Sequence, residues 1–345
     1  MIKSSIDDSK KNKELDSKVV VSNDEEIVSA ESEQKIRPTK IKDIIGRVQE
    51  KKTISMMIDS ARNRGEVVDH ILFYGPPGLG KTTFAMAIAH EMGSSIRITS
   101  GPAIERQGDL AAILTGLKAN DVLFIDEIHR LSKVVEEILY PAMEDGVLDI
   151  VMGKGPSAKT IRLSLEPFTL IGATTQIGKI GSPMRDRFGL VQRLDFFEKE
   201  DMINILDRAR KLWNIEMSED ALGLLAECSR GTARIGLRLL KRTRDYASKY
   251  KKTTVDINVV QDTLDLLGVD KLGLEDIDRQ VLVVMMNHFN GGPVGLSTLA
   301  AAVCEDISTL SGVYEPYLMK CGFLKRTSRG RVLTSKGIKY VEDIL

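Results

Sequence analysis

The chain has few residues of the kinds that metal sites and disulfides need. Its 345 residues include three cysteines and four histidines. Cys228, Cys304 and Cys321 form no C-x-x-C pair, and the scattered histidines show no zinc spacing. The sequence therefore predicts no structural zinc site. Isolated cysteines of this kind suit a reducing compartment, so we expect a cytoplasmic protein.

Long apolar runs and an excess of charge of one sign are also missing. No apolar run approaches the roughly 20 residues that a membrane-spanning helix needs. The first residues lack the apolar core of a secretory signal, so we expect neither secretion nor a membrane partner. The 49 basic residues balance the 49 acidic ones. Any surface for nucleic acid must then be local.

Length and composition favour a globular chain of two or three domains behind a polar tail. The hydrophobic content of 42% is enough for real cores. Residues 1–35 are rich in Lys, Asp, Glu and Ser. Such a segment buries too little apolar surface to offset its ordering entropy, so we predict a disordered tail. A peptide that binds a partner is the alternative.

The strongest motif is the stretch GPPGLGKT at residues 75–82. It follows an apolar run at 71–74 and precedes a helical pattern, so strand, loop and helix occur in the order of a P-loop. Glycines such as Gly78 and Gly80 let backbone N–H groups turn around a phosphate. Lys81 reaches the β- and γ-phosphates, and the Thr82 hydroxyl is placed to hold Mg²⁺. The motif predicts nucleotide binding; a structural glycine turn is the alternative.

A second motif, DVLFIDE, occupies residues 121–127. Its continuous apolar run predicts a strand buried on both faces, as in parallel sheets. Ligands in open α/β sheets bind at the carboxyl ends of strands. Asp126 is therefore placed to hold Mg²⁺ and Glu127 to polarise an attacking water. Two solvated acids that merely end a strand are the alternative.

Further strands and helices surround these motifs. A strand at 168–173 ends at Thr174 and Thr175, beside the acidic strand. A hairpin is predicted from 148–152 and 160–165; near its tip, Ile150, Val151 and Met152 are either an apolar docking surface or ordinary strand core. Other predicted elements are helices at 49–64, 108–117 and 131–144, the last bent or ended by Pro141, and a strand at 95–99.

The second half of the chain is mostly helical. Helices are predicted at 200–214, 218–229, 233–246 and 257–267. Arg234 falls in the first turn of its helix, where the dipole disfavours a cation unless a ligand phosphate lies nearby. Three more helices and a β-hairpin follow, which is a winged-helix pattern. Residues 320–339 contain seven Lys or Arg and no acid, so the wing is predicted to contact DNA; a solvated basic face is the alternative.

These motifs resemble those of AAA+ ATPases, and most closely those of the RuvB family, whose members drive branch migration of Holliday junctions. The resemblance runs from about residue 36 to the C-terminus. It implies a tail at 1–35, an α/β P-loop AAA+ domain with a parallel sheet flanked by helices at 36–197, a small all-helical lid at 198–268, and a C-terminal winged-helix domain at 269–345. The stretches that carry it are GPPGLGKTT, DVLFIDEIHRL, EEILYPAMED, GATT, MRDRFG, RGTARI, GGPVGLSTLAAA, YEPYL and GFLKRTSRGR.

The resemblance also implies ATP and Mg²⁺ as cofactors, and it assigns roles to individual residues. The catalytic residues it implies are Lys81, Asp126, Glu127, Thr174 or Thr175 as sensor 1, Arg187 as the arginine finger and Arg234 as sensor 2. The nucleotide contacts it implies are Ile36, Arg37, Gly78, Gly80, Lys81, Thr82, Thr83, Glu144, Asp145, Gly146, Phe197 and Arg234. Thr82 and Asp126 are the implied metal ligands.

The partners implied by the resemblance are double-stranded DNA at Holliday junctions, RuvA, RuvC and five further copies of the chain in a hexamer. Arg326, Arg329 and Arg331 of the wing would contact DNA, and Ile150, Val151 and Met152 of the hairpin would contact RuvA. The implied activity is ATP-driven branch migration in recombination and repair. The alternative is a nucleotide switch of clamp-loader or initiator type, which binds DNA without moving it. At five positions the residue differs from the one that is usual in the family: Gly146, Gln176, Phe197, Ala233 and Gly236.

Overall fold

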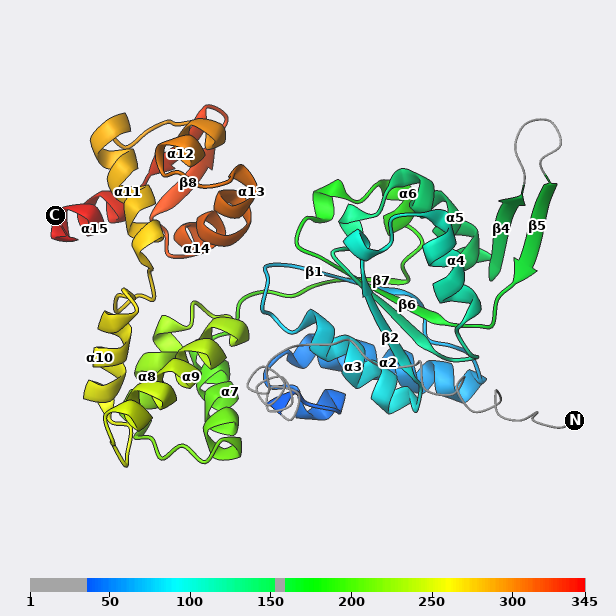
Figure 1. Cartoon of the computed structure of the whole chain (residues 1–345), viewed down its shortest axis with the longest axis horizontal. Helices are drawn as coiled ribbons and strands as arrows, with labels where there is room; N and C mark the ends of the chain where they lie inside the picture. The colour runs from blue at the N-terminus through cyan, green and yellow to red at the C-terminus, as the bar shows by residue number, and fades with distance from the viewer. Residues whose placement is uncertain (1–35, 153–158, 345) are drawn as a thin grey trace, which may run out of the picture. The chain divides into compact units, whose positions relative to one another are not determined.

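The structure, a computed structural model, describes residues 36–152 and 159–344 (Figure 1). The chain divides into two compact units, Met1–Arg37 and Pro38–Leu345. The predicted tail at 1–35 and the predicted hairpin tip at 153–156 lie outside the described residues. Within the described residues, no helix has both the length and the apolarity to cross a membrane.

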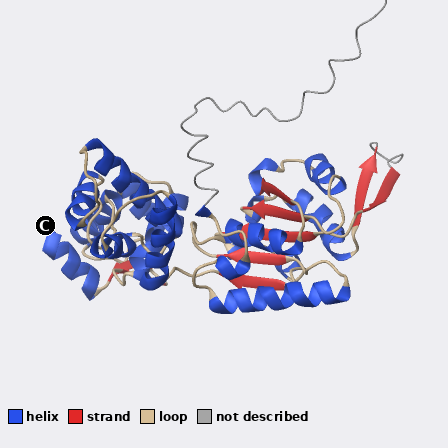
Figure 2. Cartoon of the chain, turned by 90° about the horizontal axis from the view of Figure 1, so that it is seen from below, coloured by secondary structure: helices blue, strands red, loops and turns tan. Residues whose placement is uncertain are grey.

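A five-stranded parallel sheet forms the centre of the first domain, with helices on both sides (Figure 2). The strand order is β2-β3-β6-β1-β7, and every neighbouring pair is parallel. All carboxyl ends therefore meet at one edge, which confirms the predicted parallel sheet. The strands are β1 (Ile71–Tyr74), β2 (Ile96–Ser100), β3 (Val122–Asp126), β6 (Thr169–Thr174) and β7 (Leu190–Arg193).

Alternating side chains of the strands bind helices to each face of the sheet. Phe73 of β1 stacks on Phe84 of α3 (Lys81–Met92), with ring centroids 5.4 Å apart. Leu72 and Leu123 point to the other face, in a buried cluster with α4 (Gln107–Thr115) and α5 (Lys133–Glu144). Figure 1 shows α3 and α2 (Val48–Arg64) on one side of the sheet and α4 and α5 on the other.

One strand of this domain was not predicted, whereas the predicted helix around Pro141 ends at Glu144, as expected. Strand β7 was not predicted, because Val191 and its neighbours are partly exposed and form no apolar run. Pro141 does not end its helix, since α5 continues to Glu144. The proline removes one hydrogen bond, but the buried residues on either side of it, Leu139 and Ala142, hold the helix on the core.

The predicted hairpin is present. Its strands, β4 (Val147–Met152) and β5 (Lys159–Ser164), pair antiparallel and form a separate two-stranded sheet. In Figure 2 this ribbon stands off the parallel sheet.

Four helices form the lid: α7 (Lys199–Leu212), α8 (Glu219–Cys228), α9 (Ala233–Lys249) and α10 (Ile257–Leu266). Ser218 caps α8, because its hydroxyl accepts a hydrogen bond from the Ala221 N–H at 3.3 Å. Gly236 is buried in α9. A Cβ atom there would lie 2.7 Å from both Met202 Cε and Ser229 Oγ, so these side chains would have to shift to admit a larger residue.

The C-terminal domain has the predicted winged-helix elements around its own buried core. They are α11 (Asp276–Phe289), α12 (Leu296–Ala302), a helical stretch formed by α13 (Ile307–Thr309), η6 (Leu310–Tyr314) and α14 (Glu315–Lys320), and the hairpin of β8 (Leu324–Thr327) and β9 (Gly330–Leu333). A last helix, α15 (Ser335–Ile344), was not predicted. The domain boundaries expected at 197/198 and 268/269 stay predictions.

Candidate functional site

The P-loop presents a buried lysine at the start of α3. Gly78 and Gly80 adopt φ values of +78° and +92°, which favour glycine. Lys81 is 8% exposed, and its Nζ donates to the carbonyls of Gly75 and Pro76, each at 2.8 Å. Burial lowers the pKa of Lys81 to about 8; Asp126 opposes this shift and Arg234 adds to it. A bound anion would restore the charge that burial disfavours.

The two acids after β3 differ in their surroundings. Asp126 ends the strand, and its Oδ1 accepts a hydrogen bond from the Glu127 N–H at 2.9 Å. Glu127 has a left-handed φ of +48°, which turns its side chain away from the strand direction. Its Oε2 lies 3.0 Å from Arg130 Nη1, in a half-exposed ion pair. Arg130 was not predicted as a neighbour of the acidic pair.

Thr174 and Thr175, the alternatives for sensor 1, have different environments. Thr174 is 1% exposed, and its Oγ1 lies 2.9 Å from His129 Nδ1. The same Oγ1 accepts the Gln176 N–H at 2.9 Å, so the hydroxyl has two partners. Thr175 is exposed at the same edge of the sheet. Sequence reasoning missed His129; its position two residues after Glu127 was the available signal.

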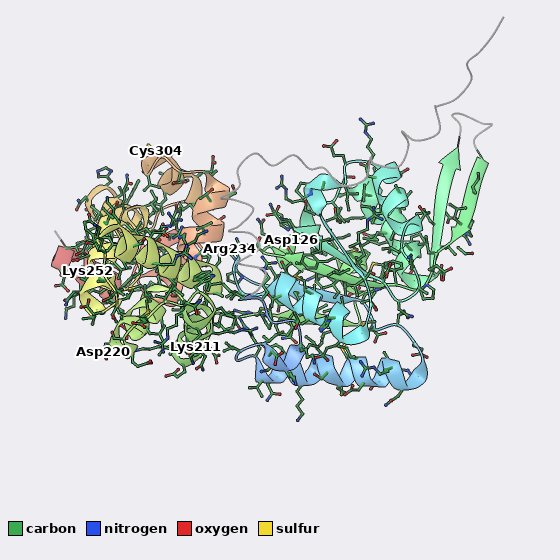
Figure 3. All side chains as sticks on the ribbon, turned by 60° about the horizontal axis from the view of Figure 1, so that its bottom comes forward. Asp126, Lys211, Asp220, Arg234, Lys252 and Cys304 are labelled. Atoms are coloured by element: carbon green, nitrogen blue, oxygen red, sulfur yellow. The ribbon has the colours of Figure 1, made fainter. Side chains whose placement is uncertain are left out.

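Arg234 of the lid lies against the P-loop. A Cβ atom on Gly78 would lie 2.8 Å from Arg234 Cβ, so glycine at this position permits the close approach of α9. Thr82 and Thr83 occupy the first turn of α3 and are half-buried. Figure 3 labels Asp126 and Arg234, which come from the sheet and from the lid. The structure thus brings Lys81, Asp126 and Arg234 into one site.

Arg187 lies in a different place. Its Nη2 pairs with Glu144 at 3.1 Å, its Nη1 donates to the Pro183 carbonyl at 2.5 Å, and its guanidinium covers the Tyr140 ring at 4.4 Å. Arg187 and Gly146 line a cavity of about 450 Å³. The cavity is also lined by Ala142 and Met143 of α5 and by residues 67–70, 166–168 and 186–189, and these three segments precede β1, β6 and β7.

The basic wing is held by one buried acid. Glu315 is 2% exposed, and its two oxygens accept hydrogen bonds from Arg326 at 2.8 and 2.8 Å and from Arg331 at 2.9 and 3.3 Å. Burial opposes the ionisation of Glu315, but these hydrogen bonds outweigh it and hold its pKa below the usual value. Arg329 at the turn is exposed. Glu315 was missed; an acid at the start of the helix that precedes a basic hairpin was the signal.

The remaining predicted residues are not tested by the geometry. Ile36 and Arg37 belong to the first compact unit, so their role toward adenine stays a prediction. Phe197 is 8% exposed and carries the Arg47 guanidinium 4.2 Å above its ring. Asp145 is exposed just after α5. The hairpin residues lie in β4, where Ile150, Val151 and Met152 pair with Ile161, Thr160 and Lys159.

A phosphate loop, a strand-end acid and a lid arginine at one edge of a parallel sheet define a P-loop ATPase, which binds ATP. Comparison with known proteins identifies the family within this class. Models of the RuvB P-loop domain, the RuvB AAA lid domain and the RuvB C-terminal winged helix domain match residues 36–194, 197–270 and 271–342. The chain belongs to the RuvB family of AAA+ ATPases.

Individual relatives cover nearly the whole chain. The Holliday junction branch migration complex subunit RuvB of Fusobacterium nucleatum is 51% identical over 314 residues, which are 91% of this chain and 95% of that protein. The structure of the RuvB Holliday junction branch migration motor of Thermotoga maritima is 45% identical, with a TM-score of 0.81 over 89% of this chain and 98% of that one. A single-residue variant of it reaches a TM-score of 0.83 at 45% identity over 90% and 99%.

Proposed function

We propose that this chain is an ATP-driven motor that forms a ring on double-stranded DNA and moves Holliday junctions. The P-loop, the strand-end acids and the lid arginine supply an ATPase site, and the winged helix supplies a second, basic surface. Contacts to the DNA backbone suit a motor that must pass over any sequence. The resemblance to junction-migrating relatives connects the two surfaces.

The position of Arg187 is the observation that supports the proposal of a ring. Its cavity is lined by the segments that precede β1, β6 and β7, whereas the P-loop follows β1. The arginine and the P-loop are therefore at opposite edges of one sheet, separated by at least the length of β1, roughly 13 Å. Arg187 cannot reach the phosphates of its own subunit. We infer that it completes the site of a neighbour, and head-to-tail contacts of this kind form a ring when the rotation between subunits closes. The hexamer is what the family resemblance implies.

Magnesium is the metal that the site's donors suit. The Thr82 hydroxyl and the Asp126 carboxylate are hard oxygen ligands, which Mg²⁺ prefers together with water and phosphate oxygens. In the part of the chain that the structure describes, no group of three His, Cys, Asp or Glu residues could hold a metal without such help. When bound, Mg²⁺ neutralises charge that develops on the transferring phosphoryl group. Glu127 would orient the attacking water, and Lys81 and the neighbour's arginine would stabilise the oxygens.

The partners follow from the surfaces. The β4–β5 hairpin, with Ile150 to Met152 on one strand, is proposed to bind RuvA, and RuvC is proposed to join the same junction complex in the cytoplasm. Exposed Ile161 and Leu163 on β5, at 43% and 36%, support an apolar contact there. The wing, with Arg326, Arg329 and Arg331, is proposed to face the DNA backbone.

The deciding experiment is dissociation of a labelled four-way junction by the full chain, with and without ATP and RuvA, while ATP turnover is measured. A motor separates the junction only while ATP is hydrolysed, and RuvA raises the rate. A nucleotide switch of clamp-loader or initiator type would bind the junction in an ATP-dependent way and leave its arms in place. That second result would reject the motor.

A further inference from the structure

Arg230 and Asp278 form an ion pair that is almost completely buried between the lid and the winged helix. Their side chains are 4% and 0% exposed, and Arg230 Nη2 donates to Asp278 Oδ2 at 2.6 Å. Arg230 Nε donates to the Gly273 carbonyl at 2.6 Å, and its guanidinium lies 5.2 Å above the Tyr317 ring. One lid side chain therefore holds the interdomain linker, α11 and α14.

The burial makes this pair hard to separate. Asp278 Oδ2 also accepts the Glu275 N–H at 2.9 Å, which fixes the carboxylate to the first turn of α11. Removing either partner while the domains stay packed would leave an uncompensated buried charge, and that state is strongly unfavourable. The contact is therefore a stiff joint, whatever its net contribution to folding.

The other end of the same short segment reaches the nucleotide site. Phe197 N–H donates to the Gly231 carbonyl at 2.8 Å, and Gly78 of the P-loop lies against Thr232 and Arg234. Residues 230–234 thus contact the P-loop at one end and the winged helix at the other.

A neighbouring ion pair provides a contrast. Arg238 of α9 pairs with Glu275 at 2.5 Å, but its side chain is 56% exposed. Exposed pairs contribute little, because water screens them and the side chains lose entropy. Glu275 also lies 3.7 Å from Arg230 Nη2, so the exposed pair adjoins the buried one. Removing the Arg238 charge leaves the contact between Arg230 and Asp278 in place, so the two pairs separate the effect of burial from the effect of position.

We propose that Arg230 and Asp278 are positioning residues that lock the winged-helix domain to the lid, so that both move as one body when the nucleotide changes. Neither side chain belongs to the ATPase site or to the basic wing. The inference rests on the proposed motor function. It assigns to this pair the transmission of lid movement to DNA.

The first test compares Asp278→Asn with Arg238→Gln in the full chain. Loosening the buried joint is expected to lower junction dissociation about ten-fold while ATP hydrolysis stays within about two-fold, so more ATP is consumed per junction. Arg238→Gln is expected to leave both rates unchanged. Equal loss of hydrolysis and dissociation in Asp278→Asn, or no loss of either, would overturn the proposal.

The second variant removes both charges. Replacing Arg230→Met and Asp278→Leu together refills the joint with apolar side chains, which often keeps a buried contact intact. The number of junctions dissociated per ATP hydrolysed is expected to recover to at least half of the wild-type value. If the double variant is as uncoupled as Asp278→Asn, the joint does not act through rigid contact.

The third measurement needs no junction and no variant of the joint. Spin labels are placed on native Cys304 of the winged helix and on Lys252→Cys of the lid, both exposed and labelled in Figure 3, with Cys321→Ser to avoid a third label. The proposal predicts one narrow distance distribution, identical with ADP and with a non-hydrolysable ATP analogue. A distance that changes with nucleotide would refute the locked joint, even in a chain that migrates junctions normally. Failure of the wild type to migrate junctions would instead reject the motor.

Discussion

The P-loop and the wing both present basic side chains, but their charges are balanced in opposite ways. Lys81 contacts two carbonyl oxygens, and burial lowers its pKa. Arg326 and Arg331 are both paired with Glu315, a full negative charge inside their own domain. The P-loop therefore needs an anion from outside, whereas the wing is already partly neutralised.

This difference indicates how each surface binds phosphate. A desolvated cation gains most from a ligand that brings a complete charge, so the P-loop is suited to tight, localised binding. Paired arginines keep a fixed orientation and offer only their remaining donors. The wing is then suited to weaker contacts that form and break as DNA passes. Arg329, which is exposed at the turn, is the group in the wing best placed to respond to DNA.

The largest effect is expected on ATP hydrolysis when the P-loop lysine is replaced. Lys81→Ala removes the buried cation and should lower the kcat/KM of ATP hydrolysis by about 10³-fold. Lys52→Ala on the exposed face of α2 is the matched control and should change nothing. A steady-state assay decides the matter. Activity within ten-fold of wild type would show that the P-loop lysine does not meet the phosphates.

A smaller effect is expected when the wing loses its internal acid. Glu315→Gln leaves two arginines without their shared charge and should lower the free energy of unfolding of the winged helix by about 3 kcal/mol. Glu342→Gln, at an exposed position of α15, is the control. Thermal and denaturant unfolding measure the difference. An unchanged midpoint would mean that the arginines are not held by Glu315 in solution.

The pH dependence of stability tests whether the ionised form of Glu315 stabilises the winged helix. A carboxylate with a lowered folded-state pKa stabilises the domain above its unfolded pKa, about 4.3, and that stabilisation is lost as pH falls below it. The wild-type domain should therefore lose more stability between neutral pH and acid than Glu315→Gln does.

At the exposed end of the wing the expected effect is a few-fold. Arg329→Ala should weaken binding to duplex DNA about equally for all sequences and reduce the slope of log affinity against log salt by up to about 0.9. Arg326 and Arg331 are less suitable for substitution, because their loss also exposes Glu315. A salt slope equal to wild type would remove Arg329 from the DNA surface.

The smallest effect concerns protons taken up with nucleotide. Because the pKa of Lys81 is about 8 without ligand and bound phosphates should raise it, binding at pH 8 should take up about half a proton. At pH 7 the uptake should fall to about 0.1. Calorimetry in buffers of different ionisation enthalpy measures both values. A binding enthalpy independent of buffer at pH 8 would contradict the lowered pKa.

The predictable parts of this molecule are the ones that are local in sequence. The P-loop and the acids after β3 each lie within a few consecutive residues, so spacing alone identified them. The joint between Arg230 and Asp278 was not predictable, since 48 positions separate the two residues and only the packed domains bring them together.

Other features of the chain could be explained only from the structure. Gly236, inside α9, leaves room for Met202 and Ser229, whose side chains would have to shift to admit a Cβ atom. The wing was predicted from its charges, but charge counting could not show that Glu315 already binds two of the arginines. Burial and pairing, not composition, decide how such side chains act.

The central claim is that two subunits build each ATPase site, because Arg187 and the P-loop lie at opposite edges of the sheet. The direct measurement mixes Lys81→Ala subunits with Arg187→Ala subunits, after mixed rings are shown to form. Each variant alone should be inactive, and mixing should restore hydrolysis at interfaces where an intact P-loop meets an intact arginine. If mixed rings hydrolyse no more ATP than either parent, the shared site is wrong.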